Sequence, residues 1–150
     1  MDIGAGNTYP ANRLSNFTPH HFVFNDVVCH SMEGLLQAFK FKNPDMQAEV
    51  CTMIGVNAKY KGKKKKWGVT QTLWWKGKEI DRHGDEYQNL LDRAYQAMYN
   101  QCPKFRKALK ASGNAVFTHS KGRWHPSVTI LTVSEFCGRL TKLRDTGKLV

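Results

Sequence analysis

The sequence predicts an α+β fold, in which a mainly helical single domain carries a small antiparallel sheet. The chain has 150 residues, which is the usual length of one domain and enough to enclose a core and a pocket. Apolar residues recur at helical spacing through most of the chain, and strand-forming runs are few and short. Because no repeat or low-complexity linker divides the chain, we expect residues 1–150 to form one domain.

The N-terminal segment combines a loop with a hairpin. Residues 1–19 are rich in Gly, Asn and Pro and are expected to form a loop. Residues 21–30 contain two short β-prone runs, and Asn25-Asp26 stand between them. Two turn-forming residues between such runs are typical of a tight β-hairpin.

A helix is expected to follow Ser31, which is a favourable N-cap. One face of this helix is apolar, with residues at i, i+3, i+4 and i+7: Met32, Leu35, Leu36 and Phe39. A second line is polar and consists of Glu33, Gln37 and Lys40. An acid, an amide and an amine on one line can hydrogen-bond a polyol or a phosphate. A carboxylate in the first turn is also favoured by the helix dipole, so a purely structural Glu33 is the alternative.

The middle of the chain is expected to continue with helices. Asn43-Pro44 is typical of an N-cap followed by the first helical residue, and this helix is expected to stop at Gly55. A short turn is expected over residues 57–60. Residues 69–76 are expected to be helical, with Gly77 as their end.

The C-terminal half shows the clearest helical pattern. Residues 84–100 place five apolar side chains on one side, and a second helix is expected to start at Pro103. Residues 115–119 and 128–131 are expected to be strands. Thr132–Glu135 has the spacing of a capping box, which predicts the start of a last helix.

The charge of the chain is strongly positive and unevenly distributed. The formal net charge is +11, and residues 59–82 hold nine basic residues against two acidic ones. Such a segment attracts phosphates, whether in a nucleic acid or in a nucleotide. Lys61–Lys66 are followed by Trp67, Trp74 and Trp75. Cations interleaved with aromatic residues suit base stacking beside phosphate contacts. The alternative is a solvated basic loop next to core tryptophans.

Cysteine and histidine spacing indicates neither a metal site nor a cofactor. The four cysteines stand at 29, 51, 102 and 137, which excludes a CxxC pair, and the six histidines lack zinc-ligand spacing. No stretch is long and apolar enough for a membrane span, and the N-terminal segment lacks the pattern expected of a secretory signal. We therefore expect a cytoplasmic protein with reduced thiols and no membrane partner.

Three further groups are candidates for chemistry. Leu14–Phe17 places the polar pair Ser15 and Asn16 between apolar residues in a loop, where binding groups are common. Lys59 has five other lysines within eight residues, and such neighbours favour the neutral amine that a nucleophile needs; a phosphate-binding lysine is the alternative. His119-Ser120 is a weak catalytic pair, because no acid is placed to orient the histidine.

These blocks resemble the NADAR family, whose members are also called YbiA-like. The resemblance rests on Leu14–Phe17, on Ser31–Lys40, on Ala58-Lys59 with Gly62, and on a tryptophan near position 74. It covers roughly residues 12–144, and the part up to Lys40 is the most specific.

The resemblance implies a small, mainly helical α+β domain that hydrolyses N-glycosidic bonds between ribose and a base. ADP-ribosyl compounds, such as ADP-ribosylated guanine, and related ribosylated nucleotides are the implied substrates. It implies that Glu33 is the catalytic acid and that Lys59 is the family lysine. The implied substrate-binding residues are Asn16, Phe17, Gln37, Lys40 and one of Trp74 and Trp75. To these we add, as candidates from the residues themselves, Ser15 of the loop, Arg82 of the basic segment and His119 of the C-terminal stretch.

Two mechanisms and two further functions stay open at this point. Glu33 fits stabilisation of positive charge on the sugar, or activation of water, whereas Lys59 fits attack on an opened sugar to form a Schiff base. Most family members carry an acidic residue and a Trp-Gly-x-Gly segment near the C-terminus, but this chain has Phe117–Trp124 there. A module that binds ADP-ribose without cleaving it is therefore one alternative. Nucleic-acid binding through Lys61–Lys66 is the other.

Overall fold

The computed structural model describes residues 1–150 and shows a mainly helical domain with two small antiparallel sheets. The helices are α1 (Ala11–Leu14), α2 (Met32–Ala38), α3 (Pro44–Cys51), α4 (Gly55–Lys63), α5 (Trp67–Thr70), α6 (Asp85–Gln101), α7 (Pro103–Ala111) and α8 (Val133–Thr146). The strands are β1 (Phe22–Phe24), β2 (Val27–Cys29), β3 (Thr72–Trp75) and β4 (Lys78–Asp81). The predicted fold class is confirmed, with two separate two-stranded sheets in place of one.

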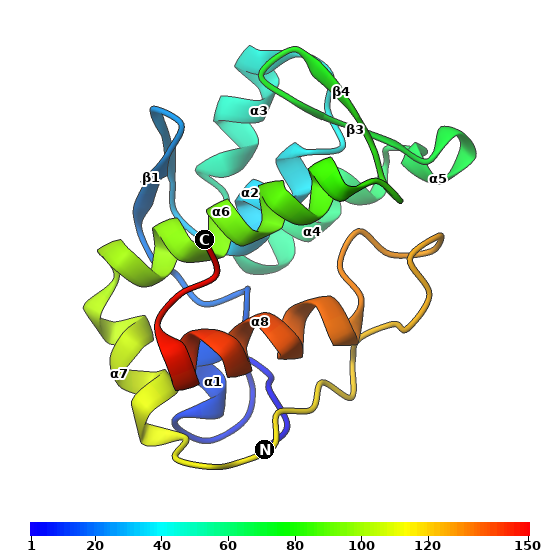
Figure 1. Ribbon diagram of the computed structural model, residues 1–150. Coiled ribbons are helices and arrows are strands. Elements are labelled where there is room, and N and C mark those ends of the chain that lie inside the picture. Colours follow the sequence, from blue (N-terminus) through cyan, green and yellow to red (C-terminus); the bar gives the residue numbers. More distant parts are fainter.

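Helix α6 runs across the middle of the molecule (Figure 1). On one side of it lie α2, α3, α4 and the hairpin β3–β4, and on the other lie α1, α7 and α8. A core of 33 buried hydrophobic residues extends from Ile3 to Leu143 and joins the two sides. The predicted inner face of α6 is confirmed, because its apolar residues are buried: Tyr87, Leu90, Leu91, Ala94 and Met98. This shared core fixes α2 relative to α6.

The start of α2 is held by neighbouring backbone. Ser31 caps the helix as predicted: its Oγ accepts a hydrogen bond from Gly34 N at 3.0 Å and donates one to Met53 O at 2.8 Å. Gly34 has no room for a side chain, since a Cβ there would lie 2.6 Å from Met53 O. The first turn of α2 is therefore pressed against the segment between α3 and α4.

The helix predicted over residues 69–76 is wrong. Helix α5 ends at Thr70, and Thr72–Trp75 pairs with Lys78–Asp81 as a hairpin. The turn residues Lys76 and Gly77 both have positive φ, 50° and 86°, which is the two-residue geometry that matches strand twist. Alternation along β3 buries Leu73 and Trp75, so a period of two applies here and not the helical period.

Three smaller predictions are also corrected. Residues 115–119 and 128–131 are not strands, because no strand pairs with them; Thr118 makes only an isolated bridge with Asp2. The helix that begins at Pro44 ends at Cys51, before Gly55. Residues 57–60 are part of α4, which is longer than the short turn expected.

The loop expected over residues 1–19 is interrupted by the short helix α1, whereas the other remaining elements agree with the sequence patterns. The β1–β2 hairpin turns at Asn25-Asp26, α7 begins at Pro103, and α8 begins with the predicted capping box. In that box Thr132 Oγ1 accepts from Glu135 N at 3.1 Å, and Glu135 Oε1 accepts from Thr132 N at 2.8 Å. None of the helices combines the length and the apolarity that a membrane crossing requires.

Candidate active site

Glu33 lies in the first turn of α2, where the loop before β1 packs on the helix. Glu33 N donates to Asn16 O at 3.1 Å, and Gln37 Nε2 donates to Glu33 Oε2 at 3.2 Å. Gln37 is one turn further along α2 and is buried. The helix thus brings together the acid and the amide that the sequence places four residues apart.

Asn16 is fixed from a second direction by α6. Tyr95 Oη donates to Asn16 Oδ1 at 2.9 Å, and the amide nitrogen of Asn16 makes no hydrogen bond within the chain. Ser15 Oγ accepts from Phe17 N at 3.2 Å, which shapes the loop, and Phe17 is half-buried. Burial raises the pKa of Tyr95 well above its usual value, so its hydroxyl keeps its proton and remains a donor. Asn16, whose backbone carbonyl accepts from Glu33 N, therefore keeps a free donor in its side chain.

Burial of Glu33 raises the pKa of its carboxyl. The hydrogen bond from Gln37 and the positive charges of Lys40 and Lys59, with a smaller effect of His119, act in the opposite direction, without cancelling the effect of burial. Desolvation disfavours the charged form of an acid, whereas donors and cations favour it. A carboxyl with a raised pKa is suited to acid–base chemistry near neutral pH.

The two lysines near Glu33 differ in exposure. Lys40 follows the end of α2 and is half-buried, whereas Lys59 is exposed on α4. Burial lowers the pKa of the Lys40 ammonium; Glu33 opposes this and Lys59 adds to it. The predicted polar line of Glu33, Gln37 and Lys40 thus lies next to Lys59 of α4, and the acid and the two lysines form a cluster of opposite charges.

His119 reaches the cluster from the long segment between α7 and α8. Its Nδ1 lies 2.8 Å from Ile3 O, and its ring meets the ring of Phe136 edge-on at 5.2 Å between centroids. Because a carbonyl oxygen only accepts, Nδ1 carries the proton and Nε2 is free to accept one. This places a second titratable group near Glu33 from a distant part of the sequence.

The two adjacent tryptophans of β3 have different surroundings. Trp75 is buried, stacks on Phe24 and donates its Nε1–H to Asn25 Oδ1 at 2.9 Å, so it belongs to the core. Trp74 is half-buried, and the Lys42 ammonium lies 5.2 Å from its ring centroid. Trp74 N donates to Phe39 O at 2.8 Å, which ties this ring to the end of α2.

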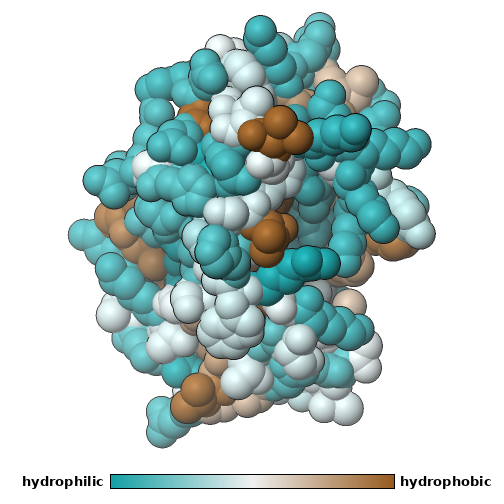
Figure 2. Space-filling model, turned by 90° about the vertical axis from the view of Figure 1, so that its right-hand side faces the viewer, coloured by the Kyte–Doolittle hydropathy of each residue, from teal (hydrophilic) through white to brown (hydrophobic).

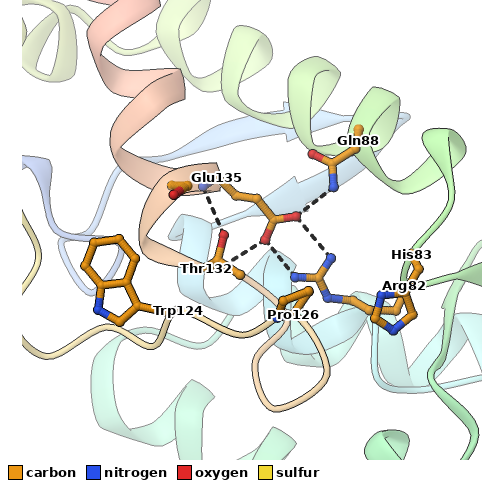
Figure 3. Close-up of a pocket in the computed structure, with 8 residues that line it drawn as sticks. Arg82, His83, Gln88, Trp124, Pro126, Thr132 and Glu135 are labelled. Atoms are coloured by element: carbon orange, nitrogen blue, oxygen red, sulfur yellow. Dashed lines mark hydrogen bonds and ion pairs between the residues drawn. The ribbon is translucent and has the colours of Figure 1, made fainter.

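Arg82 is buried in a separate polar network, which Figure 3 shows. Its guanidinium forms two hydrogen bonds with Glu135, at 3.0 and 2.7 Å, and its Nε donates to Thr129 O at 3.0 Å. Burial alone would raise the pKa of Glu135, but hydrogen bonds from Arg82, Thr132 N and Gln88 lower it. Each of the three guanidinium nitrogens of Arg82 thus donates a hydrogen bond within the protein, which assigns Arg82 to the fold and not to a substrate.

This network lines a hollow of about 300 Å³ under the exposed Trp124. None of the residues that surround Glu33 line this hollow. The structure therefore separates the predicted site residues. Glu33, Gln37, Lys40, Lys59, Asn16 and His119 are brought together, whereas Arg82 and Trp75 are held elsewhere by their own partners.

Comparison with known proteins places the chain in a family. The model of the bacteriophage protein GP30.3 family matches residues 8–145. The chain belongs to this family. A protein of Enterobacteria phage T4, described as an uncharacterized 17.1 kDa protein in the Gp30-rIII intergenic region, is 32% identical over 148 residues and 97% of each chain.

The fold is that of the Escherichia coli protein YbiA. The NMR structure of YbiA matches with a TM-score of 0.63 over 95% of this chain and 80% of YbiA, at 14% sequence identity. The predicted YbiA-like fold is confirmed. At this level of identity the likeness establishes the fold and leaves the chemistry to the residues.

Tyr95 is a member of the cluster that the sequence patterns did not single out. It lies on the buried side of α6, among apolar residues, so its spacing indicates a core position. Its hydrogen bond to Asn16 joins residues 79 positions apart. A hydroxyl on an otherwise apolar helix face was the available signal, because a buried tyrosine usually finds a hydrogen-bond partner.

Proposed function

We propose that the protein is an N-glycosidase that hydrolyses the bond between ribose and a base in ADP-ribosyl or related ribosylated nucleotides. One observation carries the proposal: Glu33 is a half-buried carboxyl whose pKa is raised by desolvation, joined through its backbone to the loop of Asn16 and within the field of Lys40 and Lys59. The YbiA-like fold, together with the NADAR-type blocks of the sequence, supports the same reaction class.

The proposed reaction breaks the bond between ribose C1′ and the base nitrogen. The nitrogen leaves with the electron pair and takes up a proton, while a water molecule loses a proton and bonds to C1′. Positive charge develops on the sugar as the bond breaks, and the Glu33 carboxylate stabilises it or receives the proton of the water. Lys40, with its lowered pKa, is placed to donate a proton or hydrogen bond to the leaving base.

Polar groups around Glu33 match the rest of such a substrate. The Asn16 amide nitrogen suits a ribose hydroxyl, and Lys59 suits a pyrophosphate. The half-buried ring of Trp74 offers a surface on which a base can stack. We therefore propose these residues, with Ser15 and Phe17 shaping the loop, as the substrate-binding side of the site.

The test is hydrolysis of ADP-ribosylated guanine nucleosides, NAD and ribosylaminopyrimidines, with release of free base followed by chromatography. The proposal expects release from at least one of them, at a rate that Glu33→Gln lowers. Binding of ADP-ribose without turnover of any substrate would instead make the protein a sequestering module. If neither binding nor turnover occurs with folded protein, the proposal fails.

The Schiff-base route through Lys59 makes a different prediction. An imine between a lysine and an opened sugar is reduced by borohydride to a stable amine, which adds the mass of the sugar to the protein. Because Lys59 is exposed, we expect no such adduct and a rate that depends mainly on Glu33. An adduct that Lys59→Gln abolishes would assign the chemistry to the lysine.

A nucleic acid is the proposed partner of the lysines of α4 and the segment after it. Lys61–Lys66 make none of the four ion pairs of the structure. Lys65 lies 5.1 Å from the ring centroid of Phe41, and Lys63 lies 5.9 Å from that of Tyr60. Figure 2 shows a mainly hydrophilic face on which hydrophobic residues are isolated. Phe41 is buried, whereas Tyr60 is exposed, so unneutralised lysines beside the Tyr60 ring suit the backbone and one base of a single strand.

The salt dependence of binding tests this partner. Affinity for a single-stranded oligonucleotide should fall steeply with salt, and Lys63→Gln with Lys64→Gln should reduce that slope. The matched control is Lys104→Gln with Lys107→Gln on α7, which removes two exposed lysines elsewhere. Equal losses in the two double variants would show that net charge alone, and not this segment, drives binding. We place these activities in the cytoplasm, where the four buried cysteines would stay reduced.

A further inference from the structure

Helices α2 and α4 approach most closely at Gly62 and Gln37. A Cβ at position 62 would lie 1.8 Å from Gln37 Oε1 and 2.7 Å from Gln37 Cδ. No side chain larger than hydrogen fits there while Gln37 keeps its place. Gly62 and Ala58 are the buried residues of α4, one turn apart, so this face of α4 is shaped to lie against α2.

The Gln37 amide has an unequal set of partners. Its Nε2 donates to Glu33 Oε2 at 3.2 Å, whereas its buried Oε1 has no hydrogen-bond partner. A buried acceptor without a partner is unfavourable. Because an ionised carboxylate only accepts, the amide must turn its nitrogen toward Glu33 and leave its oxygen against Gly62. The contact with α4 thus holds the amide in the one orientation that serves Glu33.

Resting on the proposed role of Glu33, we infer that Gln37 and Gly62 are positioning residues: Gly62 makes room for the Gln37 amide, which holds the Glu33 carboxylate as its hydrogen-bond donor. The other groups that act on Glu33 do so through charge. They are Lys40 after α2, Lys59 on α4 and His119 before α8, while Tyr95 on α6 faces Glu33 as an uncharged hydroxyl. Gln37 alone donates a hydrogen bond to the Glu33 side chain.

The experiment follows the Glu33 carboxyl carbon by NMR during a pH titration of glutamate-labelled protein. Gln37→Met keeps the length of the side chain and removes the donor, and Gly62→Ala displaces the amide. Both variants should raise the midpoint of Glu33 by about one pH unit, which is the scale of one hydrogen bond to a carboxylate. Ala58→Gly is the matched control on the same face of α4 and should leave the midpoint unchanged.

A double variant separates positioning from packing. Gly62→Ala combined with Gln37→Ala makes room for the new methyl group, so it should recover melting temperature lost in Gly62→Ala while the raised midpoint remains. An unchanged midpoint in Gln37→Met overturns the inference, and so does recovery of both properties in the double variant. If Gly62→Ala does not fold, Gln37→Met decides. The titration needs no turnover, so an inactive protein with the expected shifts would contradict only the proposed function.

Discussion

Glu33 and Glu135 are two carboxylates in the same structural position with opposite properties. Each lies in the first turn of a helix, α2 or α8, and each is largely covered by other segments. Glu135 accepts four hydrogen bonds, from Arg82 Nη1 and Nη2, Gln88 Nε2 and Thr132 N, at 2.6–3.0 Å. The Glu33 side chain accepts one, at 3.2 Å.

The opposite pKa shifts of the two carboxyls come from their hydrogen-bond partners and not from their place in a helix. A first-turn carboxylate is favoured by the helix dipole in both cases. At Glu135 the bonds from Arg82, Gln88 and the backbone outweigh desolvation and lower the pKa, whereas at Glu33 desolvation outweighs its one bond and the nearby cations. A carboxylate such as Glu135, which accepts four hydrogen bonds from the protein, stabilises the fold and has no free lone pair for a reaction. An under-bonded one retains the capacity to accept a proton or to face a developing positive charge.

Glu33→Gln should have the largest effect on activity of any change at the two carboxylates. We expect hydrolysis to fall by about 10²-fold or more, because a positioned acid or base contributes on that scale. Glu135→Gln, assayed at a temperature where it is folded, should lose less than about tenfold, since it is absent from the site. Steady-state rates of base release measure both, and similar losses in the two variants would break the comparison.

Removal of Glu135 should have the largest effect on stability. Glu135→Ala leaves the guanidinium of Arg82, which is 1% exposed, without its partner. Breaking a buried ion pair in this way destabilises by about 3–5 kcal/mol. Glu33→Gln should instead raise the free energy of unfolding at neutral pH, because it removes a poorly compensated buried charge. Urea unfolding of the two variants beside the natural chain would show the opposite signs.

The two carboxylates should also give opposite pH dependences. Glu33 has a folded-state pKa above its usual value of 4.5, so its ionisation destabilises the folded protein above that folded-state pKa, and this effect disappears as pH falls below 4.5. Glu135 has a folded-state pKa below 4.5, so its stabilisation is present above 4.5 and is lost as pH falls through the folded-state pKa. Differences in unfolding free energy between each Gln variant and the natural chain, measured from pH 3 to pH 8, test both signs.

Gln88→Ala should have the smallest effect on stability, and it tests whether the hydrogen bonds of Glu135 matter for the reaction. Gln88→Ala removes one of the four hydrogen bonds of Glu135, together with the bond that Gln88 Oε1 accepts from Arg139, and should cost about 2 kcal/mol without lowering the rate of hydrolysis. Three bonds remain, so Glu135 should stay ionised. A loss of activity in this variant would indicate that the Arg82–Glu135 network contributes to the reaction.

The helix that carries the candidate site could be predicted from the sequence because the information there is local. Ser31, Glu33, Gln37 and Lys40 are linked by one helical period, and the capping box at Thr132 is complete within four residues. Strand β3 was predicted as part of a helix over residues 69–76, although Lys76-Gly77 is a two-residue turn with β-prone residues before it. Two adjacent residues of a helix cannot both face the core fully. In the strand they lie on opposite faces, so Trp75 is buried and Trp74 is half-buried.

The rest of the site depends on contacts that no local pattern contains. Arg82 was assigned to the substrate from its place in a basic segment, yet its partner Glu135 lies 53 residues away. Tyr95 is spaced as a core residue, and only the fold brings its hydroxyl to Asn16. The approach of Gly62 to Gln37 is likewise a property of how α4 packs on α2.

The most direct test of the central claim is a crystal structure of the Glu33→Gln variant with an ADP-ribosylated guanine nucleoside. We expect ribose C1′ to lie beside the side chain at position 33, with the Asn16 amide nitrogen on a ribose hydroxyl. A substrate bound in the hollow under Trp124, with the Glu33 cluster empty, would contradict that claim.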